Sequence, residues 1–294
     1  HWKPDAVIFI DFPGFNLRIV KQVKKLGITS FYYISPTVWA WKEGRVKLFK
    51  RYVDHLFCIF PFEQSFYKTR HNYKVEYVGH PLLDMLQKNL KPSTLDEFCF
   101  QNNFLQKKIV AILPGSRTSE IRENLRTMQE IIPQFPDYQF VVAGMSHFDE
   151  NFYRQFITNN AISIVFGKTQ QLLQIADGAV VVCGTASLEA ALIGCPEVIV
   201  FKTNPITFYF GKMIVKLNYL GLPNIIMDKE IAPEYLQGEM TASNISSSLH
   251  KILFDEDYRN KILDNYKALK TILGDGGASV KAASLIYTYM NSKN

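Results

Sequence analysis

The stretch from Lys107 to Arg126, KKIVAILPGSRTSEIRENLR, constrains the fold more than any other part of this chain. Its branched apolar run, Ile109 to Leu113, is typical of a buried parallel strand. The turn at Pro114–Ser116 breaks that strand, and an amphipathic helical pattern follows from Ser119. A strand, a glycine-bearing turn and a helix in this order predict an α/β domain built on a parallel sheet.

The turn in this stretch has the chemistry of an anion site. Gly115 and Ser116 precede a helix N-terminus, where unpaired backbone N–H groups and the helix dipole attract negative charge. Arg117 could add a two-pronged contact to a phosphate. We interpret the turn as a diphosphate cradle. The alternative is an ordinary turn with a surface arginine, because PGSR matches neither a P-loop nor a dinucleotide fingerprint.

A second turn of the same kind follows the apolar run Gly178–Cys183. Small residues, Gly184 and Thr185, stand where a strand passes into a helix and again offer backbone N–H groups at close approach. Glu189, about one turn into that helix, could accept both hydroxyls of a ribose or simply stabilise the helix N-terminus. Two such turns favour a nucleotide diphosphate site.

Short apolar runs alternate with helical patterns along the whole chain, which predicts parallel sheets throughout. We expect the interdomain connection at residues 87–106, where the apolar periodicity is lost. The expected strands are residues 6–10, 30–34, 55–60, 75–78, 109–113, 140–143, 162–166, 178–183 and 196–201.

The first strand ends at Asp11, at the edge where open α/β sheets bind ligands. Asp11 is therefore a candidate general base; the alternative is a helix N-cap or turn former. His80 also follows a strand and a glycine, and could contact a ligand or form a structural hydrogen bond.

Trp39 and Trp41, which flank one alanine, are followed at once by Lys42 and Arg45. Aromatic faces beside cations suit sugar rings, phosphates or the boundary of an acyl chain. The alternative is that the tryptophans pack in the core. Core packing could explain one tryptophan, but it explains two tryptophans next to two basic residues less easily.

The net charge of +6 is concentrated at the beginning of the chain. Residues 1–75 hold 13 Lys and Arg against 5 Asp and Glu, and the remainder holds 20 against 22. This predicts an anionic partner for the first part, such as lipid headgroups or a phosphorylated substrate, and we find no nucleic-acid motif. A solvated basic face is the alternative.

The four cysteines are scattered, without metal-ligand spacing, and are expected to be free thiols in a reducing cytosol. No signal peptide or membrane-spanning run is present in the sequence given. The segment 208–216, apolar with lysines at roughly helical spacing, could lie against a membrane interface or be a buried helix.

Several motifs follow one another in a fixed order along the chain. They are IDFPGFN (10–16), YYISPTVWAWKEGRV (32–46), FPFE (60–63), VGHPLLD (78–84), LPGSR (113–117), GTASLEAAL (184–192), LPN (222–224) and PEYLQ (233–237). In this order they resemble the lipid-A-disaccharide synthase family, the inverting glycosyltransferases of Gram-negative lipid A biosynthesis. The resemblance covers nearly the whole chain, and SPTVWAW and LPGSR are its most specific parts.

The resemblance implies a GT-B fold, in which two Rossmann-like parallel-sheet domains face each other across a cleft. We expect an acceptor- and membrane-facing domain at residues 1–104, and a UDP-sugar-binding domain with C-terminal helices at 105–294. The first domain is expected to be incomplete at its N-terminus, because the family's first strands and a glycine-rich GETSGD-like motif are absent. Gly14 also stands where some members carry a second acid.

The resemblance also implies the reaction. UDP-2,3-diacylglucosamine gives its sugar to 2,3-diacylglucosamine 1-phosphate, forming the β-1,6-linked disaccharide and UDP. It implies no metal and no cofactor, a cytoplasmic location on the inner face of the cytoplasmic membrane, and peripheral contact with an anionic surface.

Roles for particular residues follow from the matching motifs. Asp11 would remove a proton from the attacking hydroxyl, and Trp39, Trp41, Lys42 and Arg45 would meet the acceptor phosphate or the membrane. The donor would be held by Gly115, Ser116, Arg117, Gly184, Thr185, Glu189, Asn224, Glu234 and Gln237.

Two other functions remain open at this point. A UDP-sugar epimerase of similar build would need extra acid and base groups and has no use for an aromatic, basic lobe. A non-catalytic UDP-binding fragment would bind UDP without turnover.

Overall fold

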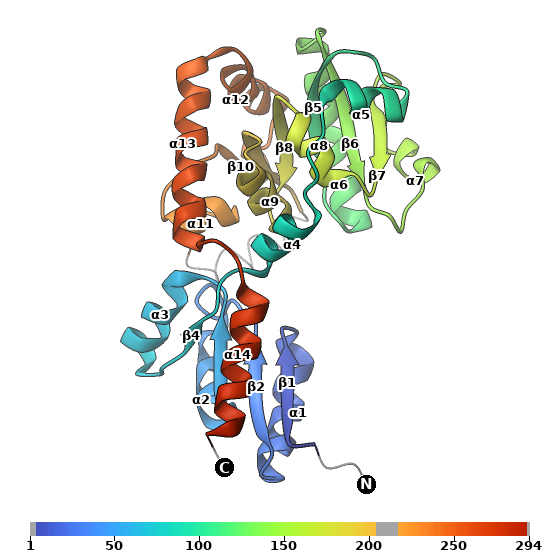
Figure 1. The fold of residues 1–294 in the computed structure, drawn as a ribbon. Helices are drawn as coiled ribbons and strands as arrows, with labels where there is room; N and C mark the ends of the chain where they lie inside the picture. Colours follow the sequence, from blue (N-terminus) through green and yellow to red (C-terminus); the bar gives the residue numbers. More distant parts are fainter. Residues whose placement is uncertain (1–3, 204–216, 293–294) are drawn as a thin grey trace. The chain divides into compact units, whose positions relative to one another are not determined.

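The computed structural model describes residues 4–203 and 217–292. These residues divide into two units: residues 4–88 with 271–292, and residues 89–203 with 217–270. Each unit contains its own parallel β-sheet (Figure 1). The predicted α/β class with two parallel-sheet domains is therefore confirmed.

The sheet of the first unit has the strand order β1-β2-β3-β4, and every neighbouring pair is parallel. Since parallel neighbours need a crossover, helices separate the strands along the chain. The elements are β1 (Ala6–Ile10), α1 (Pro13–Lys25), β2 (Thr29–Tyr33), η1 (Glu43–Arg45), α2 (Val46–Tyr52), β3 (His55–Cys58), α3 (Pro61–His71), β4 (Glu76–Tyr77) and the start of α4 (Pro81–Asn89).

The core of the first unit contains the fully buried Val20, Tyr32, Phe49 and Tyr67. A second, smaller cluster joins the sheet to α14 (Ala278–Asn291), the last helix of the chain. Within it, Ala282 of α14 packs with Phe31 and Phe57, and Figure 1 shows this helix running alongside the strands. Helix α14 is thus part of the first unit.

The sheet of the second unit has the order β10-β9-β8-β5-β6-β7 and is also entirely parallel. Its strands are β5 (Lys108–Leu113), β6 (Tyr138–Gly144), β7 (Ser163–Phe166), β8 (Gly178–Val182), β9 (Glu197–Phe201) and β10 (Glu234–Leu236). Its helices are α5 (Leu95–Asn102), α6 (Thr118–Met128), η2 (Gln129–Gln134), α7 (Glu150–Arg154), α8 (Thr169–Ile175), α9 (Thr185–Ile193), α11 (Leu222–Met227), η3 (Gln237–Glu239), α12 (Ala242–Phe254) and α13 (Glu256–Leu273).

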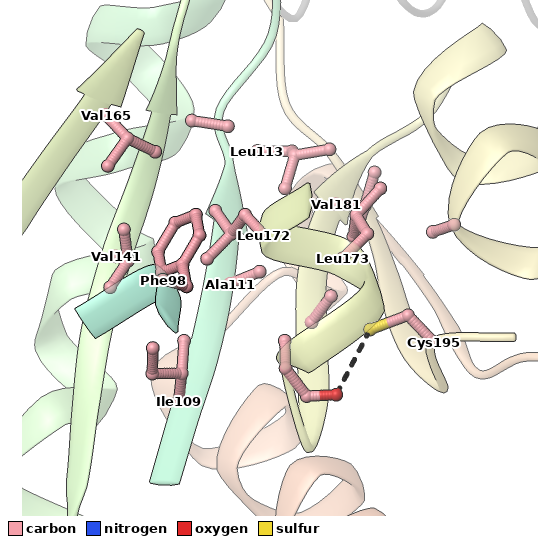
Figure 2. Close-up of a cluster of buried hydrophobic side chains, with 14 of the residues drawn as sticks. Phe98, Ile109, Ala111, Leu113, Val141, Val165, Leu172, Leu173, Val181 and Cys195 are labelled. Atoms are coloured by element: carbon pink, nitrogen blue, oxygen red, sulfur yellow. Dashed lines mark hydrogen bonds between the residues drawn. The ribbon is translucent and has the colours of Figure 1, made fainter. Parts of the chain in front are cut away.

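Figure 2 shows the buried cluster on one face of this sheet. Ile109, Ala111 and Val141 from the strands meet Leu172 of α8 and Phe98 of α5. The runs of branched residues recognised in the sequence produce this core, because a parallel sheet is covered on both faces.

Two boundaries differ from the sequence prediction. Residues 87–106 were expected to be a connection, yet they contain α5, which begins at a Thr94 capping box and buries Phe98. The division expected at residue 104 also differs from the two units, since α5 belongs to the second unit and α14 to the first. The capping box starts α5, whereas the packing of α5 in the second core and of α14 on the first sheet decides the division into units.

In the described residues, no helix combines the length and the apolar character that crossing a membrane requires. The segment 208–216, for which a membrane contact was considered, lies outside the described residues. Cys58, Cys99, Cys183 and Cys195 are free thiols, and three of them are buried.

Candidate functional site

The strand order of the second unit changes direction between β5 and β8, because the chain continues from β5 to β6 on one side and returns to β8 on the other. These two strands are parallel neighbours, and Leu113 lies opposite Val181. The turns that follow them therefore lie at the same edge of the sheet. Ligands of open α/β sheets bind at such a switch point, outside the carboxyl ends of the strands.

Gly115, in the turn after β5, has a backbone conformation that only glycine adopts readily, with φ of +114°. A Cβ atom here would lie 2.9 Å from both Cβ and Oε2 of Glu120. The turn thus needs glycine for its conformation and for its close approach to the first turn of α6.

The side chain of Glu120, a residue of α6, folds back onto this turn. Its Oε2 accepts hydrogen bonds from the backbone N–H groups of Ser116 (3.2 Å) and Arg117 (3.3 Å). Its Oε1 lies 2.6 Å from Nη1 of Arg117, whose side chain is 78% exposed. The carboxylate of Glu120 therefore contacts the backbone N–H groups and the guanidinium that the sequence predicts to bind a phosphate. Sequence reasoning gave Glu120 no role, although an acidic residue at the third position of a helix is a known capping signal.

Gly184, in the turn after β8, has φ of +149°, again a glycine conformation. The helix α9 begins at the exposed Thr185, and Ser187 Oγ donates to the Gly184 carbonyl at 2.8 Å. Glu189 is partly buried, and its Oε1 accepts from Gln170 Nε2 at 3.0 Å. Burial raises the pKa of Glu189, and the Gln170 hydrogen bond opposes this rise. The structure brings both glycine turns together at one sheet edge.

Asn224 and Glu234 are bonded to each other and to backbone. Asn224 is fully buried; its Nδ2 donates to Glu234 Oε2 (3.1 Å) and to the Ala232 carbonyl (2.9 Å). Its Oδ1 accepts from the N–H groups of Ile231 (2.8 Å) and Ala232 (3.1 Å). All four hydrogen-bonding positions of the Asn224 amide are thus used inside the protein.

The other hydrogen bonds of the Glu234 and Gln237 side chains are made with backbone groups of neighbouring loops. Glu234 accepts from the N–H groups of Leu220 (2.7 Å) and Gly221 (3.0 Å). The Gln237 amide pairs with the backbone of Thr203, donating to its carbonyl at 3.0 Å and accepting from its N–H at 3.2 Å. These side chains support the backbone around Thr203 and Leu220.

Asp11, in the first unit, follows β1 in a left-handed conformation, with φ of 44°. Its carbonyl accepts from Tyr32 Oη at 2.6 Å and from Asn16 Nδ2 at 2.7 Å, so its backbone is held firmly. The side chain is exposed, and no hydrogen bond or ion pair of its carboxylate exists within residues 4–203 and 217–292. The N-cap of α1 is Phe12, which leaves the Asp11 carboxylate available.

The two tryptophans of the aromatic and basic segment have different environments. Trp41 is exposed, and the cationic groups of Lys42 and Arg45 lie 4.3 Å and 5.6 Å from its ring centre. Trp39 instead contacts the rings of Phe60 and Phe62 edge-on, and its indole N–H donates to Glu63. The structure thus groups Trp41, Lys42 and Arg45 and separates Trp39 from them.

His80 forms a structural hydrogen bond, since its Nδ1 accepts from the N–H of Leu82 at 3.2 Å. Burial lowers the pKa of His80 to about 4, so the imidazole is neutral at physiological pH.

A hollow of about 390 Å³ lies at the opposite edge of the second sheet, near the amino ends of β5, β6 and β7. Its lining includes Lys107, Tyr138 and Ser163 and none of the predicted donor residues. Within the described part of the chain, no group of three or more His, Cys, Asp and Glu residues is placed to hold a metal ion.

The chain is similar in sequence to one protein family along nearly its whole length. Residues 1–284 match the family described as lipid-A-disaccharide synthetase. The lipid-A-disaccharide synthase of Coxiella burnetii is 37% identical over 98% of this chain and 77% of its own length. That of Syntrophus aciditrophicus is 35% identical over 99% of this chain and 77% of its own length.

Solved structures share the fold at much lower identity. A UDP-GlcNAc 2-epimerase from Neisseria meningitidis, bound to UDP-GlcNAc, has a TM-score of 0.62 and 13% identity, covering 98% of this chain and 76% of the epimerase. The calicheamicin glycosyltransferase has a TM-score of 0.58 and 16% identity, with 98% and 76% covered. These likenesses show a GT-B-like architecture.

The family match favours the glycosyltransferase over the epimerase, a distinction that the fold cannot make because both classes share it. The family match covers residues 1–284, and this range includes the motifs at the carboxyl ends of β1, β5 and β8. The chain belongs to the lipid-A-disaccharide synthase family, the glycosyltransferases that act on precursors of lipid A.

Proposed function

We propose that this chain transfers 2,3-diacylglucosamine from UDP to 2,3-diacylglucosamine 1-phosphate with inversion. The bond from the sugar C1 to the diphosphate breaks, a β-1,6 bond to the acceptor forms, and the hydroxyl proton passes to a base. The observation that carries this proposal is the pair of glycine turns after β5 and β8, in a chain of this family.

The diphosphate would lie against the turns at Gly115–Arg117 and Gly184–Thr185. Backbone N–H groups and the Arg117 guanidinium would stabilise the negative charge that develops on the departing UDP. Since Glu120 contacts the same N–H groups, its carboxylate would have to give way to the diphosphate.

Glu189 would accept hydrogen bonds from the ribose hydroxyls, with Gln170 holding one carboxylate oxygen in place. Asn224, Glu234 and Gln237 would shape the donor-sugar side through the backbone that they hold. Their own polar groups are largely engaged by protein atoms.

Asp11 would act as the general base. Its backbone is fixed by Tyr32 and Asn16 while its carboxylate is exposed, as a group that takes up a substrate proton requires. The left-handed conformation, uncommon for a residue other than glycine, is a form of strain often found at functional sites.

Trp41, Lys42 and Arg45 would contact the acceptor phosphate or the anionic surface of the membrane that contains both acylated substrates, with Trp39 supporting them. We therefore propose a cytoplasmic enzyme that is peripheral to the inner face of the cytoplasmic membrane. The positive balance of residues 1–75 favours such a surface.

The test is mass spectrometry of the products after the chain is mixed with both acylated substrates in detergent. We expect the disaccharide 1-phosphate together with an equal amount of UDP. UDP release without the disaccharide, or a sugar epimer, would contradict the proposed reaction.

A variant of Asp11 tests its role as the general base. Asp11→Asn should reduce turnover about 10²- to 10⁴-fold and leave UDP affinity unchanged. Asp5→Asn, an exposed aspartate just before β1, is the matched control. Turnover of Asp11→Asn equal to that of the control would refute the assignment.

A further inference from the structure

The segment between β2 and α2 is attached to one helix, α3, at three points. Ser35 Oγ lies 2.7 Å from Tyr67 Oη, Trp39 Nε1 lies 3.2 Å from Glu63 Oε1, and Glu43 Oε1 lies 2.9 Å from His71 Nε2. These contacts are spaced along α3 from its first turn to its last residue.

The contact between Trp39 and Glu63 joins a partly exposed indole to a buried carboxyl group. The Glu63 side chain is fully buried, and its Oε2 accepts from the backbone N–H groups of Ile59 (3.1 Å) and Phe60 (2.9 Å). These bonds cap α3 and hold the carboxyl group in one orientation. The other oxygen, Oε1, is thereby directed to the Trp39 indole.

The Trp39 ring is also fixed by its neighbours. Phe62 and Phe60 contact it edge-on, with ring centres 4.9 Å and 6.1 Å away. The exposed group formed by Trp41, Lys42 and Arg45 begins only two residues later. A shift of Trp39 would therefore move the whole group.

We propose that Glu63 is a positioning residue, which holds the Trp39–Arg45 segment on α3 through the Trp39 indole and so sets the affinity for the anionic acceptor. The positioning part stands on the contacts above, and the acceptor part rests on the proposed function of Trp41, Lys42 and Arg45. No sequence motif assigned such a role to Glu63.

The charge state of Glu63 fits this role. Burial raises the pKa of Glu63 to about 7, although the N–H groups of Phe60, Ile59 and Trp39 and the Ser35 hydroxyl favour the charged form. The titratable groups around it, Cys58, Tyr67 and Tyr77, have raised pKa values and stay neutral near pH 7. His80, whose ring lies 5.2 Å from that of Phe60, is neutral there as well.

The indole N–H bonds a carboxylate more strongly than a neutral carboxyl group. The Trp39–Glu63 contact should therefore weaken as the pH falls through about 7. Hydrogen exchange in residues 36–45, corrected for the intrinsic effect of pH, should rise in the same range.

The test compares Trp39→Phe with the unchanged protein. Phenylalanine keeps an aromatic ring against Phe60 and Phe62 but has no N–H to donate, so we expect the fold to be retained while the contact to Glu63 is lost. Thr69→Ala removes a hydrogen bond to Ser65 within the same helix, away from the segment, and serves as the control. Glu63→Gln is a second variant, since one amide cannot accept from all three N–H groups as the carboxylate does.

Two measurements separate the inference from the proposed function. Hydrogen exchange of residues 36–45 should rise about 3- to 10-fold in Trp39→Phe and lose its dependence on pH, as expected when one such hydrogen bond is lost. The KM for the acceptor should rise by a similar factor, while kcat and the KM for the donor stay unchanged.

Faster exchange with an unchanged acceptor KM would support the positioning role and contradict the acceptor role of the segment. Unchanged exchange in both Trp39→Phe and Glu63→Gln, or equal changes in Thr69→Ala, would overturn the inference.

Discussion

The Arg117 guanidinium and the Glu120 carboxylate form an ion pair, with 2.6 Å between Nη1 and Oε1. The same carboxylate accepts from two backbone N–H groups of the turn after β5. The negatively charged side chain of Glu120 thus lies in the turn where we expect the donor diphosphate to bind.

Replacing Arg117 tests its contact with the diphosphate. Arg117→Ala should lower kcat/KM for the donor about 10- to 100-fold, because a charge-assisted hydrogen bond to phosphate is lost. Arg122→Ala, an exposed arginine on the same helix, should change it less than about 2-fold. Steady-state kinetics with varied donor distinguish the two, and equal effects would remove Arg117 from the site.

Replacing Glu120 tests whether its carboxylate competes with the diphosphate. Glu120→Gln should tighten UDP binding about 2- to 10-fold, since the negative charge disappears and the amide oxygen can still accept from the turn. Isothermal titration calorimetry with UDP measures this. Weaker binding would mean that Glu120 serves to orient Arg117.

Gly115 should tolerate no side chain. Gly115→Ala places a Cβ against Glu120 in a strained conformation, and should lower both the free energy of unfolding, by about 1–3 kcal/mol, and UDP affinity. Gly238→Ala is the control, because its Cβ would meet no atom within 4 Å. Urea unfolding and UDP titration of both variants provide the comparison. A Gly115→Ala variant as stable as the control would show that the turn adapts freely.

Asp84 connects distant parts of the first unit. Its carboxylate accepts from the backbone N–H groups of Gly277 (2.6 Å), Ala278 (3.0 Å) and Ser279 (2.9 Å) at the start of α14. Burial alone would raise the pKa of Asp84, but these hydrogen bonds hold it below the ordinary value.

Because its pKa is lower in the folded state, Asp84 stabilises the fold above its ordinary pKa, about 3.9, and this contribution is lost as the pH falls through the lowered value. Asp84→Asn should lower the free energy of unfolding at pH 7 by about 1 kcal/mol, and by less below pH 4. Asp264→Asn, in an exposed pair with Lys267, should cost less than about 0.5 kcal/mol. A loss for Asp84→Asn that does not depend on pH would contradict this account.

The sequence predicted the strands and the turns that follow them because both depend on neighbouring residues. Strand β1 lies at Ala6–Ile10 as expected, and the turns with Gly115 and Gly184 do follow β5 and β8. The short strand β10 was missed because three residues carry little local pattern and their pairing with β9 depends on the folded chain. Helix α5 was missed although the capping box from Thr94 to Glu97 is a local signal of a helix start.

The contacts made by three carboxylates could not be assigned from the sequence alone. Asp84 reaches α14 across almost 200 residues, a separation that no local pattern reveals. Glu63 and Glu120 stand at the third position of a helix, where a capping role is foreseeable. Their contacts with Trp39 and with the Arg117 guanidinium depend on the folded chain.

The most direct test of the central claim is hydrogen exchange of the protein with and without UDP. We expect UDP to slow exchange in residues 113–120 and 183–189, the two turns after β5 and β8, and to leave residues 103–107 beside the distant hollow unchanged. Protection elsewhere, with both turns unaffected, would contradict a donor site at the switch point of this sheet.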